Sequence, residues 1–196
     1  MDQPRTIAFD FDDTLYDSVR LFLEFNRNNF GGTATYDDIG AGNFYEYLGI
    51  TEEEETNRWN LFYSDPKFWD GAPHPETAKT LIHLKKGYRI VILTARSQAW
   101  QHQVTSWVEK HLPNIFEEII FADSDEFKNE KKVFICGKKN ISHLVDDNIG
   151  QITSCLECTD PKVGIIVFDR PWNRMIPLSV PRISSVGAVL ERELLK

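Results

Sequence analysis

The stretch Thr6-Ile-Ala-Phe-Asp-Phe-Asp-Asp-Thr-Leu-Tyr-Asp-Ser18 begins as an apolar run and ends abruptly in acidic residues. The unbroken apolar part is typical of a strand that is buried on both faces of a parallel sheet. Asp10 and Asp12 follow at its carboxyl end, and because strand side chains alternate, both carboxylates point to the same side. Ligands of open α/β sheets bind at this edge, and two like charges held together need a cation. The stretch therefore predicts a metal site with a carboxylate nucleophile.

An isolated Asp-x-Asp after a strand is also typical of an ordinary turn, because Asp is common in turns. Here, however, the fuller string Asp10-Phe-Asp-Asp-Thr-Leu15 resembles the first motif of the haloacid dehalogenase superfamily of phosphatases. That motif is Asp-x-Asp-x-Thr-Leu at the end of an apolar run. The resemblance favours the functional interpretation and predicts further motifs along the chain.

Composition limits what the protein can bind. The chain has 196 residues, enough for one domain with a substantial core and a small inserted subdomain. A formal net charge of −8 argues against binding a nucleic acid polymer, although a small anionic substrate remains possible. No apolar run approaches the ~20 residues that span a bilayer, and the amino terminus lacks an apolar signal segment. We therefore expect a cytoplasmic protein with no membrane partner; its oligomeric state is left open.

The three cysteines agree with a reducing compartment, because they are few and odd in number. Cys155-Leu-Glu-Cys158 has the spacing of a redox or zinc motif. No second pair and no nearby His completes four ligands. We interpret these cysteines as structural thiols on a helix.

Residues 18–71 are rich in aromatic side chains and contain no segment that resembles a parallel strand. Residues 19–29 have apolar side chains at helical spacing, followed by Gly31-Gly32. Thr51 is a candidate N-cap for a second helix that starts with the acidic run 52–55. We expect a helical cap over 18–71, inserted between the two parts of the core domain, 1–17 and 72–196. Most of its aromatics should be core, with one or two facing the crevice among Phe44, Tyr45, Phe68 and Trp69.

Strands and helices alternate after residue 72. Apolar runs predict strands over 88–96, 118–122, 141–147 and 163–169. Helices are expected over 76–86, ended by Gly87, and over 98–111. The inward side chains of the first of these helices should be Ala78, Leu81, Ile82 and Leu84. This alternation predicts an α/β fold, a Rossmann-like parallel sheet with helices on both faces.

Chemistry-bearing residues stand at or near the ends of these strands. Asp10 and Asp12 follow the first strand, Thr94 ends the second, Asp146 and Asp147 end the fourth, and a Lys-rich segment precedes the fourth. In a parallel sheet all carboxyl ends lie at one edge, so these residues should converge. The ordered set of Asp-x-Asp, apolar-Thr, Lys and Asp-Asp matches all four superfamily motifs. The chain is identified as a member over nearly its whole length.

The resemblance implies a phosphomonoester hydrolase that works through an aspartyl-phosphate. Asp10 would attack phosphorus, and Asp12 would protonate the leaving alkoxide and later accept a proton from water. Mg²⁺ would be the cofactor, bound by Asp10, by the backbone carbonyl of Asp12 and by the acidic pair. Within that pair the resemblance favours Asp147 as the direct ligand, with Asp146 in support.

The same resemblance assigns residues to the phosphate group. Thr94 would donate its hydroxyl together with backbone N–H groups around Ala95. Arg96 would contact phosphate or pin the cap, or equally be a surface arginine. The third-motif lysine is best matched by Lys132, with Lys131 next.

The substrate is predicted from a narrower resemblance, to the 5′(3′)-deoxyribonucleotidases, which also place a small helical cap between the first and second motifs. Phe68-Trp69 and Trp107-Val-Glu-Lys-His-Leu112 resemble that family's stretches. Pro171-Trp-Asn-Arg174 is similar to a turn of bacterial relatives, or is a plain turn after the fifth strand. Two departures are Asp13, where human-type members have Gly, and Ser18, where they have a base-stacking aromatic.

Three hypotheses follow for the function. The first is a 5′-nucleotidase acting on (deoxy)nucleoside monophosphates. The second is a phosphatase for a sugar phosphate or another small phosphomonoester. The third is a catalytically idle binding protein, which the complete set of acids disfavours.

Overall fold

The computed structural model describes residues 4–191 and is built on a sheet of six parallel strands in the order β3-β2-β1-β4-β5-β6. β1 (Thr6–Phe9) is a central strand, between β2 (Arg89–Thr94) and β4 (Ile141–Asp146). The outer strands are β3 (Glu118–Phe121), β5 (Gly164–Phe168) and β6 (Arg182–Ile183). The predicted α/β fold with a parallel sheet is confirmed.

β6 is a strand that the sequence pattern does not predict, so the expected set of strands was one short. It has two residues and extends the edge of the sheet beside β5. Val167 N–H donates to the Pro181 carbonyl at 2.8 Å, and Asp169 N–H donates to the Ile183 carbonyl at 2.7 Å. So short a strand has no periodicity to detect, and its position depends on the tertiary structure alone.

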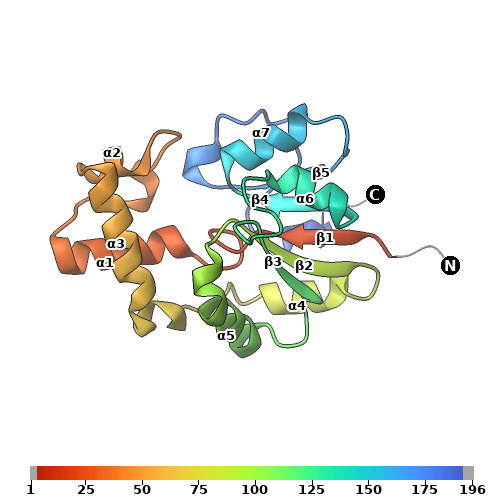
Figure 1. The fold of residues 1–196 in the computed structure, drawn as a ribbon, viewed down its shortest axis with the longest axis horizontal. Helices are drawn as coiled ribbons and strands as arrows, with labels where there is room; N and C mark the ends of the chain where they lie inside the picture. The colour runs from red at the N-terminus through yellow and green to blue at the C-terminus, as the bar shows by residue number, and fades with distance from the viewer. Residues whose placement is uncertain (1–3, 192–196) are drawn as a thin grey trace.

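Alternating side chains of the central strands feed two cores, one on each face of the sheet. Ile7 and Phe9 pack on one side with α4 (Thr77–Leu84) and α5 (Gln101–His111), whereas Ala8 packs on the other. That second face is covered by α6 (Lys132–Lys138) and α7 (Ile149–Glu157). Figure 1 shows the two pairs of helices on opposite sides of the strands. β1 is fully buried as a result.

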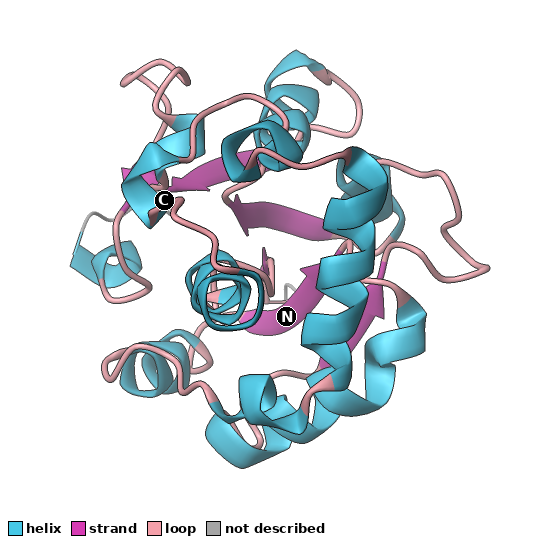
Figure 2. Ribbon diagram, turned by 90° about the vertical axis from the view of Figure 1, so that its left-hand side faces the viewer, coloured by secondary structure: helices cyan, strands magenta, loops and turns pink. Residues whose placement is uncertain are grey.

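A second group of helices lies beyond the carboxyl end of β1 and has its own apolar cluster (Figure 1). It comprises α1 (Ser18–Phe30), α2 (Phe44–Leu48) and α3 (Glu52–Ser64). Phe22, Phe25 and Phe62 are its buried centre. Seen from this end, the strands run through the middle of the molecule with helices around them (Figure 2). We call this region the cap and keep for it the predicted bounds 18–71.

Helix ends in the cap follow the local signals. α1 ends at Gly31, which adopts a left-handed φ of 71° that glycine tolerates without steric cost. α3 begins after Thr51, whose side chain accepts the Glu54 N–H. The expected end of α1 and the expected N-cap of α3 are both confirmed.

The prediction for the helix after residue 75 is partly wrong. α4 ends at Leu84, and Gly87 lies beyond its C-cap, Lys85, without a left-handed backbone. Leu81 and Leu84 are buried, but Ile82 is 56% exposed. Consecutive helical residues are separated by about 100°, so burying Leu81 turns its neighbour Ile82 toward solvent.

Short helical turns lie between the main elements: η1 (Tyr36–Asp38), η2 (Pro66–Asp70), η3 (Gln98–Trp100) and η4 (Pro171–Asn173). A short helix, α8 (Ala188–Glu191), follows β6. Cys136 and Cys155 are buried on α6 and α7, Cys158 follows α7, and all three thiols are free. Within residues 4–191, every helix is too short or too polar to pass through a bilayer.

Candidate active site

Acids from opposite halves of the chain meet at one edge of the sheet, because β1 and β4 are hydrogen-bonded neighbours. Asp10 continues the ladder beyond β1, its N–H donating to the Val145 carbonyl at 2.9 Å. Asp146 ends β4 and Asp147 follows it. One carboxylate oxygen from each of Asp10, Asp146 and Asp147 lies within 4.8 Å of the others, and all three residues are buried. The expected convergence is therefore present.

Lys132 is the cation at the centre of this cluster. It is the first residue of α6, and its Nζ lies 2.5 Å from Asp10 Oδ1 and 2.8 Å from Asp146 Oδ2. Only 1% of its surface is exposed, whereas the neighbouring candidate Lys131 is exposed. Burial by itself would lower the pKa of Lys132, but the two carboxylates raise that pKa above its usual range. Lys132 is thus a charged group held in place.

The cluster contains more acidic groups than cations. Burial, with smaller contributions from the charges of Asp146 and Asp12, raises the pKa of Asp10 to about 8 against the opposing effect of Lys132. Burial also raises the pKa of Asp147, and Asp13, Asp10 and Asp146 add to the effect. Ionised carboxylates in such a place need another cation, and oxygen donors suit a hard divalent ion such as Mg²⁺. The donor set fits the predicted metal.

Asp146 and Asp147 differ in how their oxygens are used. Asp146 Oδ2 accepts from Lys132, and Oδ1 accepts the Asn148 N–H at 2.8 Å. Asp147 Oδ2 accepts the Trp172 indole N–H at 2.8 Å. Among residues 4–191 no hydrogen bond to Asp147 Oδ1 is found. That oxygen is the one that this pair leaves for a metal.

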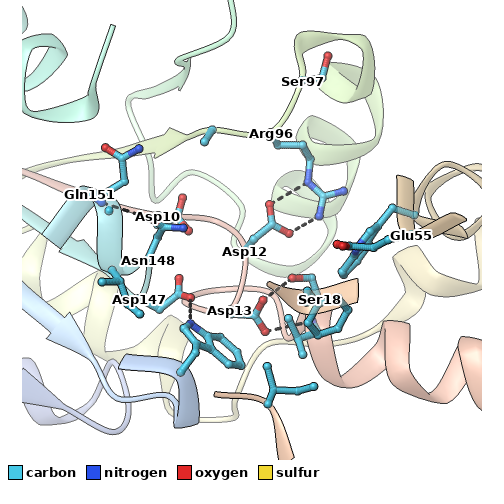
Figure 3. A pocket seen from close by; sticks show the side chains of 18 of the residues that line it. Asp10, Asp12, Asp13, Ser18, Glu55, Arg96, Ser97, Asp147, Asn148 and Gln151 are labelled. Carbon is cyan, nitrogen blue, oxygen red and sulfur yellow. Dashed lines mark hydrogen bonds and ion pairs between the residues drawn. The ribbon is translucent and has the colours of Figure 1, made fainter. Parts of the chain in front are cut away.

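Asp12 faces the cap side of the site and pairs with Arg96 (Figure 3). Arg96 Nε donates to Asp12 Oδ2 at 3.0 Å, and Nη2 contacts Oδ1, a two-pronged ion pair. The guanidinium lies 4.2 Å from the ring centre of Tyr63 and 4.8 Å from that of Trp69. Arg96 is only 6% exposed, so the alternative of a surface arginine is wrong. Its Nη1 is buried and has no hydrogen-bond partner in the described part of the chain.

Thr94 ends β2 and is fully buried. Its Oγ1 accepts the Arg96 N–H at 3.0 Å, which shapes the turn after the strand. Ala95, Arg96 and Ser97 line the cavity described below, and Thr94 is not among its lining residues. The second motif thus presents mainly its turn, rather than its threonine, to the cavity.

Asp13 is a buried acid that the motif does not account for. Its backbone has a left-handed φ of 53°, a conformation that Gly adopts freely and Asp tolerates, which explains why Gly suits this position in similar motifs. Ser18 Oγ donates to Asp13 Oδ2 at 2.6 Å, and Val19 N–H donates to Oδ1 at 3.1 Å. Asp13 therefore connects the turn after β1 to the first turn of α1. Ser18 is occupied in this bond and gives no stacking surface.

A cavity of about 710 Å³ extends from the acids to the cap. Its cap wall includes Phe44, Trp59 and Tyr63, and Trp100 of η3 closes another side. Of the four aromatics predicted as candidates for the crevice, only Phe44 lines this cavity. Phe68 packs on Phe62, and Trp69 stacks on Tyr16. The floor is ionic and the wall is aromatic.

Several lining residues were not predicted from the sequence. Trp59 and Tyr63 belong to the cap, most of whose aromatics were expected to be core, and Trp100 belongs to η3 of the core domain. Gln151 of α7 accepts the Lys132 N–H through Oε1 at 3.2 Å. Only Trp172 carried a signal, within Pro171-Trp-Asn-Arg174, and that signal did not distinguish a site from a turn. Pattern alone does not show which side of a helix meets a cavity.

Comparison with known protein families gives a match over most of the chain. The family model described as "5′ nucleotidase, deoxy (Pyrimidine), cytosolic type C protein" matches residues 4–177. A class B acid phosphatase from Morganella morganii is 30% identical over 136 residues, which cover 66% of this chain and 49% of that protein. The chain therefore spans about half the length of this curated relative.

Solved structures share the fold. A haloacid dehalogenase-like hydrolase from Streptococcus pneumoniae superimposes with a TM-score of 0.71 at 13% identity, covering 97% of this chain and 98% of that one. Protein tyrosine kinase A of Mycobacterium tuberculosis gives a TM-score of 0.68 at 16% identity, covering 100% of both chains. At such identities the likeness concerns the fold alone.

Proposed function

The chain belongs to the deoxy (pyrimidine) cytosolic type C 5′-nucleotidase family, within the haloacid dehalogenase fold, and on that premise we propose that it is a Mg²⁺-dependent 5′-nucleotidase. The observation that carries the proposal is the buried cluster of Asp10, Lys132, Asp146 and Asp147 at the floor of a cavity. Phosphoryl transfer requires an in-line nucleophile and positive charge around the transferring oxygens. This cluster contains candidates for both.

Asp10 is the proposed nucleophile. Its carboxylate would attack phosphorus, the ester P–O bond would break, and an aspartyl-phosphate would form. Lys132, 2.5 Å from Asp10 Oδ1, would orient that carboxylate and offset charge on the phosphate. Water would then release inorganic phosphate and regenerate Asp10.

Asp10, the Asp12 carbonyl and Asp147 are the proposed ligands of Mg²⁺, with Asp146 in support. The ion would supply positive charge next to the transferring phosphoryl oxygens. Asp147 is favoured as the direct ligand because Asp146 already uses both carboxylate oxygens, with Lys132 and with the Asn148 N–H. Thr94 would fix the turn that offers the Ala95 backbone to phosphate.

Asp12 is the proposed acid and base, and Arg96 its partner until substrate arrives. Asp12 is held by Arg96 in a two-pronged ion pair, whereas a general acid must be free to give a proton to the leaving alkoxide. A phosphate next to Arg96 would compete for the guanidinium, and Nη1, which has no hydrogen-bond partner among residues 4–191, offers it a further donor. Arg96 would therefore bind substrate and release Asp12 for proton transfer in the same event.

The cavity wall supports a nucleotide as the substrate. A volume of about 710 Å³ falls in the range of small-molecule sites, and the aromatic wall suits the flat ring of a base better than a hydroxyl-rich sugar. Ser18 provides no aromatic ring for stacking on a base. That role would fall to aromatic residues that line the cavity: Phe44, Trp59, Tyr63 and Trp100. The three free thiols agree with the cytoplasmic location that we propose.

The test is hydrolysis by the purified full chain, with Mg²⁺ and with excess chelator. We expect release of phosphate from dUMP and dTMP that depends on Mg²⁺, with weaker activity on glucose 6-phosphate. Inactivity on every phosphomonoester, including a generic aryl phosphate, would favour the idle binding protein. Activity on sugar phosphates with dUMP and dTMP among the worst substrates would remove the nucleotidase assignment and keep the phosphatase.

A further inference from the structure

The turn 170–174 after β5 holds Asp147 at two points. Asn173 Nδ2 donates to the Asp147 carbonyl at 2.8 Å and to the Phe168 carbonyl at 2.8 Å. The Trp172 indole Nε1–H donates to Asp147 Oδ2 at 2.8 Å. Asn173 is fully buried and its Oδ1 accepts from Arg182 at 2.7 Å, so the turn is braced from behind. Both the backbone and the carboxylate of one candidate metal ligand are therefore fixed by this turn.

Trp172 also contacts the cap. The ring of Tyr36 in η1 meets the ring of Trp172 edge to face, with centroids 5.6 Å apart and an interplanar angle of 68°. Tyr36 is in turn covered by Arg20 of α1, whose guanidinium carbon lies 4.0 Å from the Tyr36 ring centre. One indole thus touches the metal-site acid through its N–H and the cap through its ring.

We infer that Trp172 is a positioning residue that fixes Asp147 for Mg²⁺ and couples the position of the cap to the metal site. The inference rests on the proposed function, because that proposal supplies the metal. Indole N–H is a donor only, so it engages Oδ2 and leaves Oδ1 for the ion. Outer hydrogen bonds of this kind orient ligands, and losing one costs about 10–100-fold in metal affinity.

The coupling follows from the shared ring. While Tyr36 packs against Trp172, the indole is held in the orientation that its bond to Asp147 requires. When the cap moves away, the ring is free to turn and Asp147 loses its only side-chain donor among the described residues. Cap closure and metal binding therefore favour each other, as linkage requires of coupled events.

The first measurement is Mg²⁺ binding to the full chain by calorimetry, without substrate. Trp172→Phe keeps a ring against Tyr36 but removes the N–H, and we expect its Mg²⁺ dissociation constant to rise about tenfold. The matched control is Trp69→Phe, which removes an indole N–H bonded to the Tyr63 carbonyl at 2.9 Å inside the cap. Its Mg²⁺ affinity should stay within about twofold of the unmodified protein. Far-UV circular dichroism checks that each variant is folded.

The second measurement is a double-mutant cycle with Tyr36→Ala. We expect this change to weaken Mg²⁺ binding several-fold in the unmodified protein and to have no further effect in the Trp172→Phe background. Saturating Mg²⁺ should restore kcat of Trp172→Phe, so that the loss lies in the Mg²⁺ requirement.

Each failure has its own meaning. Equal Mg²⁺ affinity of Trp172→Phe and the unmodified protein would overturn the inference and leave the proposed function standing. If Tyr36→Ala and Trp172→Phe each weakened Mg²⁺ binding independently, so that their fold-changes multiplied in the double variant, the proposed coupling to the cap would be overturned. No Mg²⁺ binding by the unmodified protein would overturn both the inference and the metal in the proposed function.

Discussion

The sheet edge and the cap are built in different ways, although both line one cavity. At the sheet edge, the Lys132 ammonium makes short ionic contacts with both Asp10 and Asp146. The Asp10 N–H also donates to the Val145 carbonyl, and Asp146 Oδ1 accepts the Asn148 N–H. In the cap, aromatic rings pack on one another, as Phe22 does on Trp59 with centroids 3.7 Å apart. The proposed reacting groups are therefore fixed mainly by backbone position at the ends of β1 and β4 and at the start of α6, whereas the proposed substrate wall depends on side-chain packing. Substitutions at the sheet edge should abolish phosphate release from every substrate, and substitutions in the cap should change which substrates bind.

Two side chains connect these regions. Arg96 extends from the end of β2 to Asp12 and lies among the rings of Tyr63 and Trp69. Trp172 joins Asp147 to Tyr36. Substitutions of these residues should affect catalysis and cap position together, unlike those on either side.

The largest effect is expected from Asp10→Asn. An amide cannot act as the attacking carboxylate, so kcat should fall more than about 10³-fold on every substrate. The fold should persist, because the change removes one charge from a crowded buried cluster. Steady-state phosphate release checks the rate, and circular dichroism checks the fold. The exposed Asp125→Asn serves as the control, and substantial activity of Asp10→Asn would refute the nucleophile.

Lys132→Met should lower both activity and stability. Removing the ammonium leaves Asp10 and Asp146 buried without their cation, which costs about 3–5 kcal/mol of unfolding free energy. kcat should fall about 10²–10³-fold, because the positive charge that offsets the phosphate is lost. Urea denaturation and phosphate release are the measurements.

Lys131→Met is the matched control, since Lys131 is adjacent in sequence but exposed. It should change the unfolding free energy by less than about 0.5 kcal/mol. If Lys132→Met and Lys131→Met had the same activity and the same unfolding free energy, the buried ammonium of Lys132 would not be required at the sheet edge.

Arg96 substitutions test the connection between the regions. Arg96→Gln removes the charge that pairs with Asp12 and lies on the cap rings, and we expect kcat/KM to fall about 10–100-fold. Arg96→Lys keeps the charge but not the planar fork, so it should fall between Arg96→Gln and the unmodified protein. Kinetics at saturating Mg²⁺ decide the order. An Arg96→Lys variant with full activity would show that the fork geometry is not needed.

The smallest effect is expected from Trp100→Ala, which removes one aromatic wall of the cavity. Trp100 is one of several aromatics lining the cavity, so we expect the low end of the roughly 1–3 kcal/mol that base stacking contributes, and KM for dTMP should rise about fivefold. kcat on a small alkyl phosphate such as glycerol phosphate should stay within about threefold, because the sheet edge is untouched. Comparing the two substrates separates the effect on binding of the base from the effect on the phosphoryl-transfer step. An equal loss on both substrates would break the distinction between the two regions.

The sequence alone was sufficient to predict which candidate site residues converge, where their positions depend on where a strand ends. Asp10, Asp146 and Asp147 stand at the ends of strands, so the strand pattern indicated their convergence, and the motif resemblance added Lys132, which begins α6. Asp12 was also indicated, but its partner was not, because a contact between residues 12 and 96 leaves no local pattern. For the same reason the sequence could not exclude that Arg96 was a surface residue, although it is buried against Asp12.

What the sequence by itself determined is the parallel sheet, the order of its motifs and the set of acids at its edge, because alternation and strand ends are local properties of the chain. The tertiary structure decided which aromatics line the cavity, that Ile82 faces solvent, that β6 exists, and that Trp172 holds Asp147. Those outcomes depend on packing between segments distant in sequence, where a rotation of one helix exchanges a buried side chain for an exposed one. No local pattern encodes that choice.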